Sequence, residues 1–181
     1  HSFPITFQNQ PSGNNTGFLD QAGMLSSSFN FDASINITND SGVTKSASAR
    51  KMVQDGNFVY WLKGAVLTSI ILADHSERRV YDIGFDSYSS FRPIFHATFW
   101  PGINKVRVRY IGEVANTEVL QDMVYSLALR LGHSSPSSVY NKRRFTHYGA
   151  SRWTKEFWIG GAPSDIAINH NLAYLAKTKL V

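Results

Sequence analysis

Residues 91–102, FRPIFHATFWPG, place an arginine, an imidazole and an indole within one short segment of strand-like composition. Side chains of a strand alternate between its two faces, so one face would carry Arg92, Ile94, His96, Thr98 and Trp100. An indole can stack on the C–H groups of a sugar ring, while arginine and histidine donate directed hydrogen bonds to hydroxyl groups. This face therefore predicts carbohydrate binding. The competing interpretation is the outer face of a core strand that a loop partly covers.

A second aromatic group, residues 152–158, carries two indoles that point to opposite faces if this segment is also a strand. Trp153 would share a face with Lys155 and Phe157. We expect one indole in the core and the other at a ligand surface or at a contact with another domain. The candidate ligand-binding residues are therefore Arg92, His96, Trp100, Trp153 and Trp158.

A ridge of cations is formed by Lys105, Arg107 and Arg109, which recur at every second position with apolar residues between them. On a strand these three side chains share one face, and they could follow the charges of a polyanion such as an acidic polysaccharide. Nucleic acid is not expected as the partner, because no RNA-binding or zinc-finger motif accompanies the ridge. The alternative interpretation is a row of exposed cations that discourages strands from pairing edge to edge.

Catalytic and metal-binding motifs are missing from the sequence. It contains no nucleophile elbow, phosphate-binding loop, dinucleotide fingerprint or zinc-protease motif. The six histidines have no metal-ligand spacing, and the absence of cysteine excludes disulfides, thiolate metal sites and cysteine nucleophiles. We therefore expect no catalytic residues, no metal and no cofactor, and a binding or structural role is favoured over an enzyme.

The composition is that of a folded domain with few charges. The chain has 181 residues, of which 43% are hydrophobic and 17% charged, against roughly 25% charged in an average soluble domain. Ser, Thr, Asn and Gly must carry much of its surface, which is typical of extracellular, cell-surface or virion proteins. The net charge is +5. No apolar run is long enough for a membrane span, so membrane insertion is not expected.

Short strands are expected along most of the chain. Apolar residues alternate strictly with polar ones from Phe29 to Ile37, and residues 39–42 have the composition of a turn. A return strand is expected over 43–53, and further strands over 58–63, 66–72, 80–85, 91–100, 105–111 and 152–159. Residues 8–28 are expected to form a loop after a short strand near Ile5 and Phe7. This spacing predicts an all-β fold, an antiparallel β-sandwich that is jelly-roll-like.

Two segments admit alternatives. Residues 116–131 could form a helix capped by Asn116, or a strand over 122–131; Leu129 favours the strand because a helix would expose it. Pro93 lacks an N–H for a sheet hydrogen bond, so its strand is expected at a sheet edge or with a bulge.

The composition changes near residue 132. We expect a sandwich domain over 1–132 and, over 133–181, an appendage that packs on it and leads into a further domain of the same polypeptide. A short C-terminal helix is expected through Leu172 and Leu175, capped by residues 169–171. The sequence thus predicts a non-catalytic accessory module that binds polysaccharide outside the cell. The alternative is a structural assembly module of a cell-surface or virion protein, with the aromatics at a domain or subunit interface.

Overall fold

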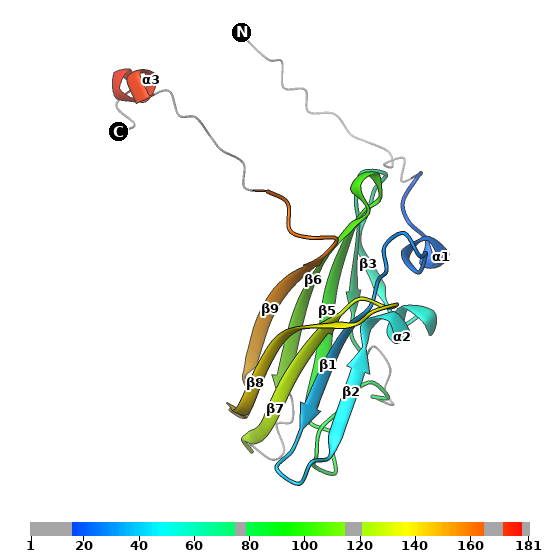
Figure 1. The fold of residues 1–181 in the computed structure, drawn as a ribbon, viewed down its shortest axis with the longest axis vertical. Coiled ribbons are helices and arrows are strands. Elements are labelled where there is room, and N and C mark those ends of the chain that lie inside the picture. The colour runs from blue at the N-terminus through cyan, green and yellow to red at the C-terminus, as the bar shows by residue number, and fades with distance from the viewer. Residues whose placement is uncertain (1–15, 75–78, 115–120, 165–171, 179–181) are drawn as a thin grey trace, which may run out of the picture.

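The structure, a computed structural model, describes residues 16–74, 79–114, 121–164 and 172–178 (Figure 1). The strands are β1 (Ala33–Thr38), β2 (Thr44–Ser48), β3 (Val59–Lys63), β4 (Thr68–Leu72), β5 (Phe91–Trp100), β6 (Lys105–Val114), β7 (Met123–Leu131), β8 (Ser137–His147) and β9 (Arg152–Ile159). The helices are α1 (Gln21–Met24), α2 (Ala49–Gln54), α3 (Leu172–Lys177) and the 3-10 turn η1 (Pro101–Ile103). None of these helices is long and apolar enough to cross a membrane.

The strands form two antiparallel sheets, which Figure 1 shows as two layers. The four-stranded sheet has the order β2-β1-β7-β8, and the five-stranded sheet has the order β3-β4-β5-β6-β9. The fold is therefore mainly β, as the sequence predicted. The finer jelly-roll-like topology is not confirmed, because β3 to β6 follow one another as neighbours within a single sheet.

The core lies between the two sheets and is built from the inward residues of the strands. On β1, burial alternates from Ala33 to Thr38, as its sequence pattern predicted. Aromatic rings from the two layers meet edge to face: the ring centroids of Phe31 and Phe99 lie 4.9 Å apart, and those of Phe91 and Tyr125 lie 5.6 Å apart. The hydroxyl of Tyr110 on β6 also crosses the layers, donating to the Arg130 carbonyl of β7 at 2.6 Å.

Residues 123–131 form a strand, which decides the helix-or-strand alternative as the alternation suggested. Leu129 is fully buried on the inward face of β7 and lies opposite Ile35 of β1 in the register. The predicted turn over 39–42 is also present, since the Gly42 N–H donates to the Asn39 carbonyl at 3.0 Å.

Three predicted elements differ from the structure. The return strand ends at Ser48 rather than continuing to residue 53, because the Ser48 hydroxyl accepts from the Lys51 N–H and caps α2. Residues 80–85 contribute only an isolated bridge, between Ile83 and Phe91. Within the expected loop over 8–28, α1 is present, capped by Asp20; the predicted strand near Ile5 lies outside the described residues.

The expected division at residue 132 falls between β7 and β8. Beyond it, β8 pairs with β7 in one sheet, and β9 pairs with β6 in the other. Local composition changes here because β8 is an exposed edge strand, in which only the last residue, His147, is buried. Residues 172–177 form the short helix α3, but the predicted C-terminal helix is not confirmed as a whole, because its capping residues, 169–171, lie outside the described residues.

Pro93 lies in a central strand, so the expectation of an edge strand was wrong. The reason is local. Phe91 exchanges both of its backbone hydrogen bonds with Ile83, on the side away from β6. Pro93, two residues on, points its nitrogen to the same side. There β4 has already ended, since the last pair between β4 and β5 is Leu72 with Phe95. The missing N–H therefore removes no sheet hydrogen bond.

Candidate functional site

The outward side chains of the five-stranded sheet form rows that cross its strands, because paired residues lie opposite one another. One row runs across all five strands and consists of Leu62, Ser69, Thr98, Arg107 and Trp158. The neighbouring row contains Ile71, His96, Arg109 and Glu156. Most of the predicted ligand residues and the whole cation ridge thus lie on one surface, which we call the outer face of the five-stranded sheet.

Two indoles and a guanidinium gather at the β9 side of this face. Trp100 and Trp158 stack with ring centroids 5.1 Å apart and an interplanar angle of 28°. The Arg107 guanidinium lies 5.7 Å from the Trp100 ring centre and 6.0 Å from that of Trp158. Both contacts are within the range of cation–π attraction, which holds the guanidinium over the aromatic pair.

The cation ridge shares a single carboxylate. Arg109 donates to Glu156 Oε2 from Nε at 3.2 Å and from Nη2 at 3.1 Å. Arg107 Nε lies 4.0 Å from the same oxygen, too far for a hydrogen bond. Lys105 Nζ lies 3.5 Å from the Ala162 carbonyl, at the end of the strand. The ridge therefore keeps net positive charge beside the two indoles.

His96 lies in the middle of the face. Its Nε2 is 2.9 Å from the Ser69 hydroxyl, and its ring packs edge-on against Trp61, with centroids 6.4 Å apart. Burial lowers the pKa of His96, and the positive charges of Arg109 and Arg107 lower it further. The imidazole is therefore neutral at pH 7 and offers hydrogen bonds rather than charge.

The pairing of Ser69 with His96 has the spacing of a nucleophile and its base, but its surroundings exclude that chemistry. Ser69 is only 4% exposed. Its hydroxyl also lies 3.1 Å from Thr98 Oγ1 and 3.4 Å from the Ala97 carbonyl, so a substrate carbon has no approach. Among the described residues, no carboxylate is hydrogen-bonded to His96 to orient it. The pair is a structural link between β4 and β5.

Arg92 is less available than the sequence suggested. Its Nε lies 3.6 Å from Asp82 Oδ1, and Arg79 contacts the other oxygen of the same carboxylate. Burial raises the pKa of Asp82 although both guanidinium groups oppose that shift. Arg92 therefore stands at the margin of the face and ties it to the turn that precedes β5.

Trp153 points into the core, which corrects its place among the candidate ligand residues. Its ring lies 6.2 Å from that of Phe91, and its Nε1–H donates to the Tyr125 hydroxyl at 2.9 Å. The indole fits because its register partner on β6 is Gly112. A Cβ at that position would lie only 2.5 Å from the indole.

The hydrogen bonds around Trp153 have a defined direction. His147 Nε2 lies 3.0 Å from the Ser151 carbonyl, and a carbonyl can only accept, so this nitrogen carries the proton. His147 Nδ1 must then accept from the Tyr125 hydroxyl, which lies 2.9 Å away. Burial lowers the pKa of His147, in keeping with this neutral form. We call this chain of Trp153, Tyr125, His147 and Ser151 the core network.

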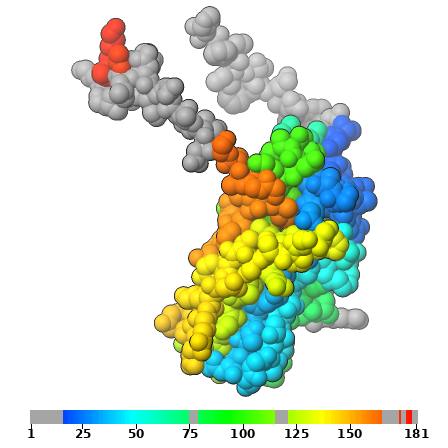
Figure 2. Space-filling model, viewed as in Figure 1, coloured from blue at the N-terminus to red at the C-terminus, as the bar shows by residue number. Residues whose placement is uncertain are grey.

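The outer face of the four-stranded sheet is different in chemistry. Apart from the apolar Val124 near the start of β7, its outward positions on β1, β2 and β7 carry small or polar side chains: Ser34, Asn36, Thr38, Thr44, Ser46, Ser48, Ser126, Ala128 and Arg130. Figure 2 shows this side of the molecule, with β1 and β2 in blue and cyan and β7 and β8 in yellow. A second run of cations, residues 142–144, lies on β8 of this sheet and does not extend the ridge of β6. The indoles and the cation ridge are thus concentrated on the outer face of the five-stranded sheet.

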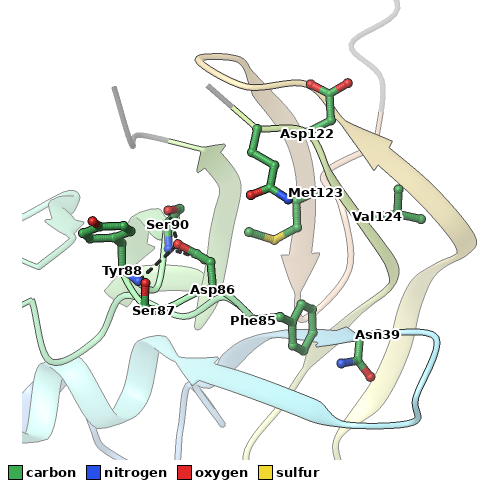
Figure 3. A pocket seen from close by; sticks show the side chains of 10 residues that line it. Asn39, Phe85, Asp86, Ser87, Tyr88, Ser90, Asp122, Met123 and Val124 are labelled. Carbon is green, nitrogen blue, oxygen red and sulfur yellow. Dashed lines mark hydrogen bonds between the residues drawn. The ribbon is translucent and has the colours of Figure 1, made fainter. Parts of the chain in front are cut away.

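A pocket of about 500 Å³ lies at the end of the sandwich, where the loop before β5 meets the start of β7 (Figure 3). Phe85, Met123 and Val124 supply its apolar wall. Its Asp86 carboxylate accepts from the backbone N–H groups of Ser90 and Tyr88, at 3.0 and 3.2 Å, and from the Ser90 hydroxyl. Asp86 therefore organises its own loop. Among the described residues, no group of three or more His, Asp or Glu side chains could hold a metal ion.

Sequence reasoning missed Trp61 and Glu156. Trp61 is the most exposed of the apolar side chains on β3, at 69%, and it lies edge-on beside His96. It shares the outward face with Val59, two residues earlier, and the β-bulge between Tyr60 and Leu62 brings Leu62 to that face as well. The role of Glu156 depends on the pairing of β9 with β6, which the sequence alone does not show.

Comparison with known proteins finds no matching family model, no similar curated protein and no similar solved structure. Function is therefore inferred from the residues of the outer face themselves.

Proposed function

We propose that the outer face of the five-stranded sheet binds a carbohydrate polymer, and that the chain is a non-catalytic accessory module of a larger extracellular protein. The carrying observation is the arrangement of indoles across this face. Trp61 lies at the β3 edge beside the row that ends at Trp158 on β9, with Arg107 and Arg109 between them. Neighbouring strands lie about 4.8 Å apart, so the row spans roughly 19 Å. An extended ligand suits such a row better than a single sugar does.

The hydrogen-bonding groups between the two edges support the same proposal. Arg109 is 47% exposed and Arg107 38% exposed, so their donors reach the surface of the sheet. The aromatic contacts of Arg107 and the carboxylate contacts of Arg109 hold both side chains in place before any ligand arrives. Such preorganisation lowers the entropy cost of binding. Thr98 is buried, so this residue of the sequence pattern is not a ligand contact.

The test is a pair of tryptophan substitutions with a matched control. Trp61→Ala and Trp158→Ala should each weaken binding to an immobilised polysaccharide panel at least about fivefold, since an aromatic stacking contact is worth about 1–3 kcal/mol. Tyr148→Ala is the control, because Tyr148 is exposed but lies outside the sheet. Circular dichroism of each variant checks that the fold is kept. If the unmodified protein binds no polysaccharide in the panel, the proposal fails.

The second candidate function is that of a structural assembly module, and one observation favours it. Apolar side chains are exposed together on the edge strand β3: Val59 at 51%, Trp61 at 69% and Leu62 at 45%. An exposed apolar edge is a common contact surface between chains. A stable oligomer that Trp61→Ala dissociates, measured by light scattering after size exclusion, would favour assembly over sugar binding.

A further inference from the structure

We propose that the polymer bound by the outer face is acidic, carrying carboxylate or sulfate groups, and that Arg107 is the residue that binds these anions. This inference rests on the proposed carbohydrate function and specifies its ligand. It begins from the charges on the face. The cations at outward positions of β5, β6 and β9 are Arg92, Lys105, Arg107, Arg109 and Arg152, and the carboxylates are Glu113 and Glu156.

Most of these cations already have an anionic neighbour. Arg92 lies beside Asp82, Arg109 is bonded to Glu156, and Glu113 lies opposite Arg152 in the register. On the described part of the face, Lys105 Nζ lies 3.5 Å from the Ala162 carbonyl, and the less well matched cation beside the two indoles is Arg107. Its nearest carboxylate oxygen is 4.0 Å away and already accepts two hydrogen bonds from Arg109. The Arg107 guanidinium therefore retains charge and donors for an incoming anion.

The surroundings of Arg107 orient its guanidinium. Trp100 and Trp158 approach it on the outer face, and their rings stack on one another, so the pair forms a rigid support. A guanidinium held in one orientation presents a planar fork of N–H donors that matches a carboxylate or sulfate. A lysine in its place would provide a charge but no fork.

A neutral sugar would compensate poorly for the water that its binding removes from the Arg107 guanidinium. Covering a partly exposed guanidinium removes water from it, and hydroxyl groups compensate that loss less than an anion does. An acidic sugar compensates the charge at Arg107 and can still stack its apolar ring face on an indole. A single-stranded nucleic acid needs successive open aromatic rings for its bases. Here Trp100 and Trp158 each cover one face of the other, and the most exposed indole, Trp61, stands apart on β3, so successive bases would not meet a run of adjacent open rings.

The experiment compares two forms of one polymer. Polygalacturonate and its methyl ester have the same backbone, but esterification removes the charge. We expect the acidic form to bind at least about tenfold more tightly in calorimetric titration, and its affinity to fall as salt rises from roughly 50 to 200 mM. Arg107→Met should abolish this preference. Arg143→Met is the matched control, because it removes one exposed cation from β8 on the other sheet and should leave affinity within about twofold.

The outcomes separate the two proposals. If both forms of the polymer bind equally and Arg107→Met changes neither affinity, the acidic-ligand inference is wrong while the carbohydrate function stands. If neither form binds, and no other polysaccharide does, both proposals fail. If single-stranded poly(dT) binds through Arg107 as tightly as polygalacturonate, the ligand is a nucleic acid and the inference is overturned. Arg107→Lys should restore only part of the preference, because it restores charge without the planar fork.

Discussion

Removal of one buried oxygen, in Tyr125→Phe, should destabilise the fold more than its size suggests. Tyr125 is fully buried, and its hydroxyl both accepts from Trp153 and donates to His147. Phenylalanine keeps the ring but leaves the Trp153 Nε1–H without an acceptor and His147 Nδ1 without a donor. An unsatisfied buried polar group costs about 1–3 kcal/mol, so two of them should cost roughly 2–6 kcal/mol of the free energy of unfolding.

Tyr110→Phe is the matched control for this experiment. Tyr110 is equally buried, but its hydroxyl makes a single described hydrogen bond, to the Arg130 carbonyl. Its loss leaves one acceptor that retains a second lone pair, so we expect a smaller cost of about 1 kcal/mol. Both variants would be unfolded in urea at about pH 7.5, above the histidine pKa range, and followed by circular dichroism.

A double-mutant cycle tests whether the core network acts as a unit. Trp153→Phe combined with Tyr125→Phe should cost less than the sum of the single changes. Once Trp153→Phe has removed the indole N–H, removal of the Tyr125 hydroxyl no longer leaves that donor without an acceptor. A coupling of at least about 0.5 kcal/mol is expected for residues in one network. If Tyr125→Phe costs no more than Tyr110→Phe, and the cycle is additive, the directed network argued from these distances is refuted.

Two further predictions concern packing and pH. Gly112→Ala should cost at least about 1–3 kcal/mol of unfolding free energy in urea, because its Cβ would lie 2.5 Å from the Trp153 ring and 2.6 Å from the Phe91 ring; a neutral effect would place Trp153 elsewhere. His96 and His147 should titrate in NMR below the ordinary histidine pKa of about 6.5, because burial lowers the pKa of both. The unfolded state then binds more protons than the folded state just below about pH 6.5, so the contribution of these histidines to stability falls as pH drops through that window. A folded-state pKa at or above about 6.5 for His147 would contradict its neutral role.

The strands that the sequence predicted well are those in which one face is core and the other is not. Burial alternates along β1 and along most of β5 and β6, so period-two patterns identified them without knowledge of their partners. The edge strand β8 has no such contrast, because nearly all of its residues are exposed or half-buried, and it was missed. The end of β2 differs from the prediction because it depends on a single residue, Ser48, which caps α2, and the apolar residues of α2 resemble a continuation of the strand.

For the candidate site, the sequence predicted only which side chains of a strand share a face, and not which face points outward. Alternation placed Trp153 and Trp158 on opposite faces correctly, but which face is inward depends on the pairing of β9 with β6. Gly112 carries that information in the structure, since its missing side chain makes room for Trp153. Without the pairing, a glycine within a strand could equally mark a bulge or a sharp bend. The shared carboxylate of Glu156 likewise depends on two strands meeting from distant parts of the chain.

The distribution of tryptophan is the strongest argument that the outer face of the five-stranded sheet contacts something. The chain has four tryptophans, and one of them, Trp153, completes the core. The other three, Trp61, Trp100 and Trp158, lie on a single face, while the corresponding face of the other sheet carries serine, threonine and asparagine. Stability alone does not account for an indole that is 69% exposed at Trp61, since exposed apolar area contributes nothing to folding. The proposed partner, by covering this face, would account for it. Trp61→Ala should therefore leave the free energy of unfolding nearly unchanged while removing binding or assembly, and a large loss of stability without either would refute this argument.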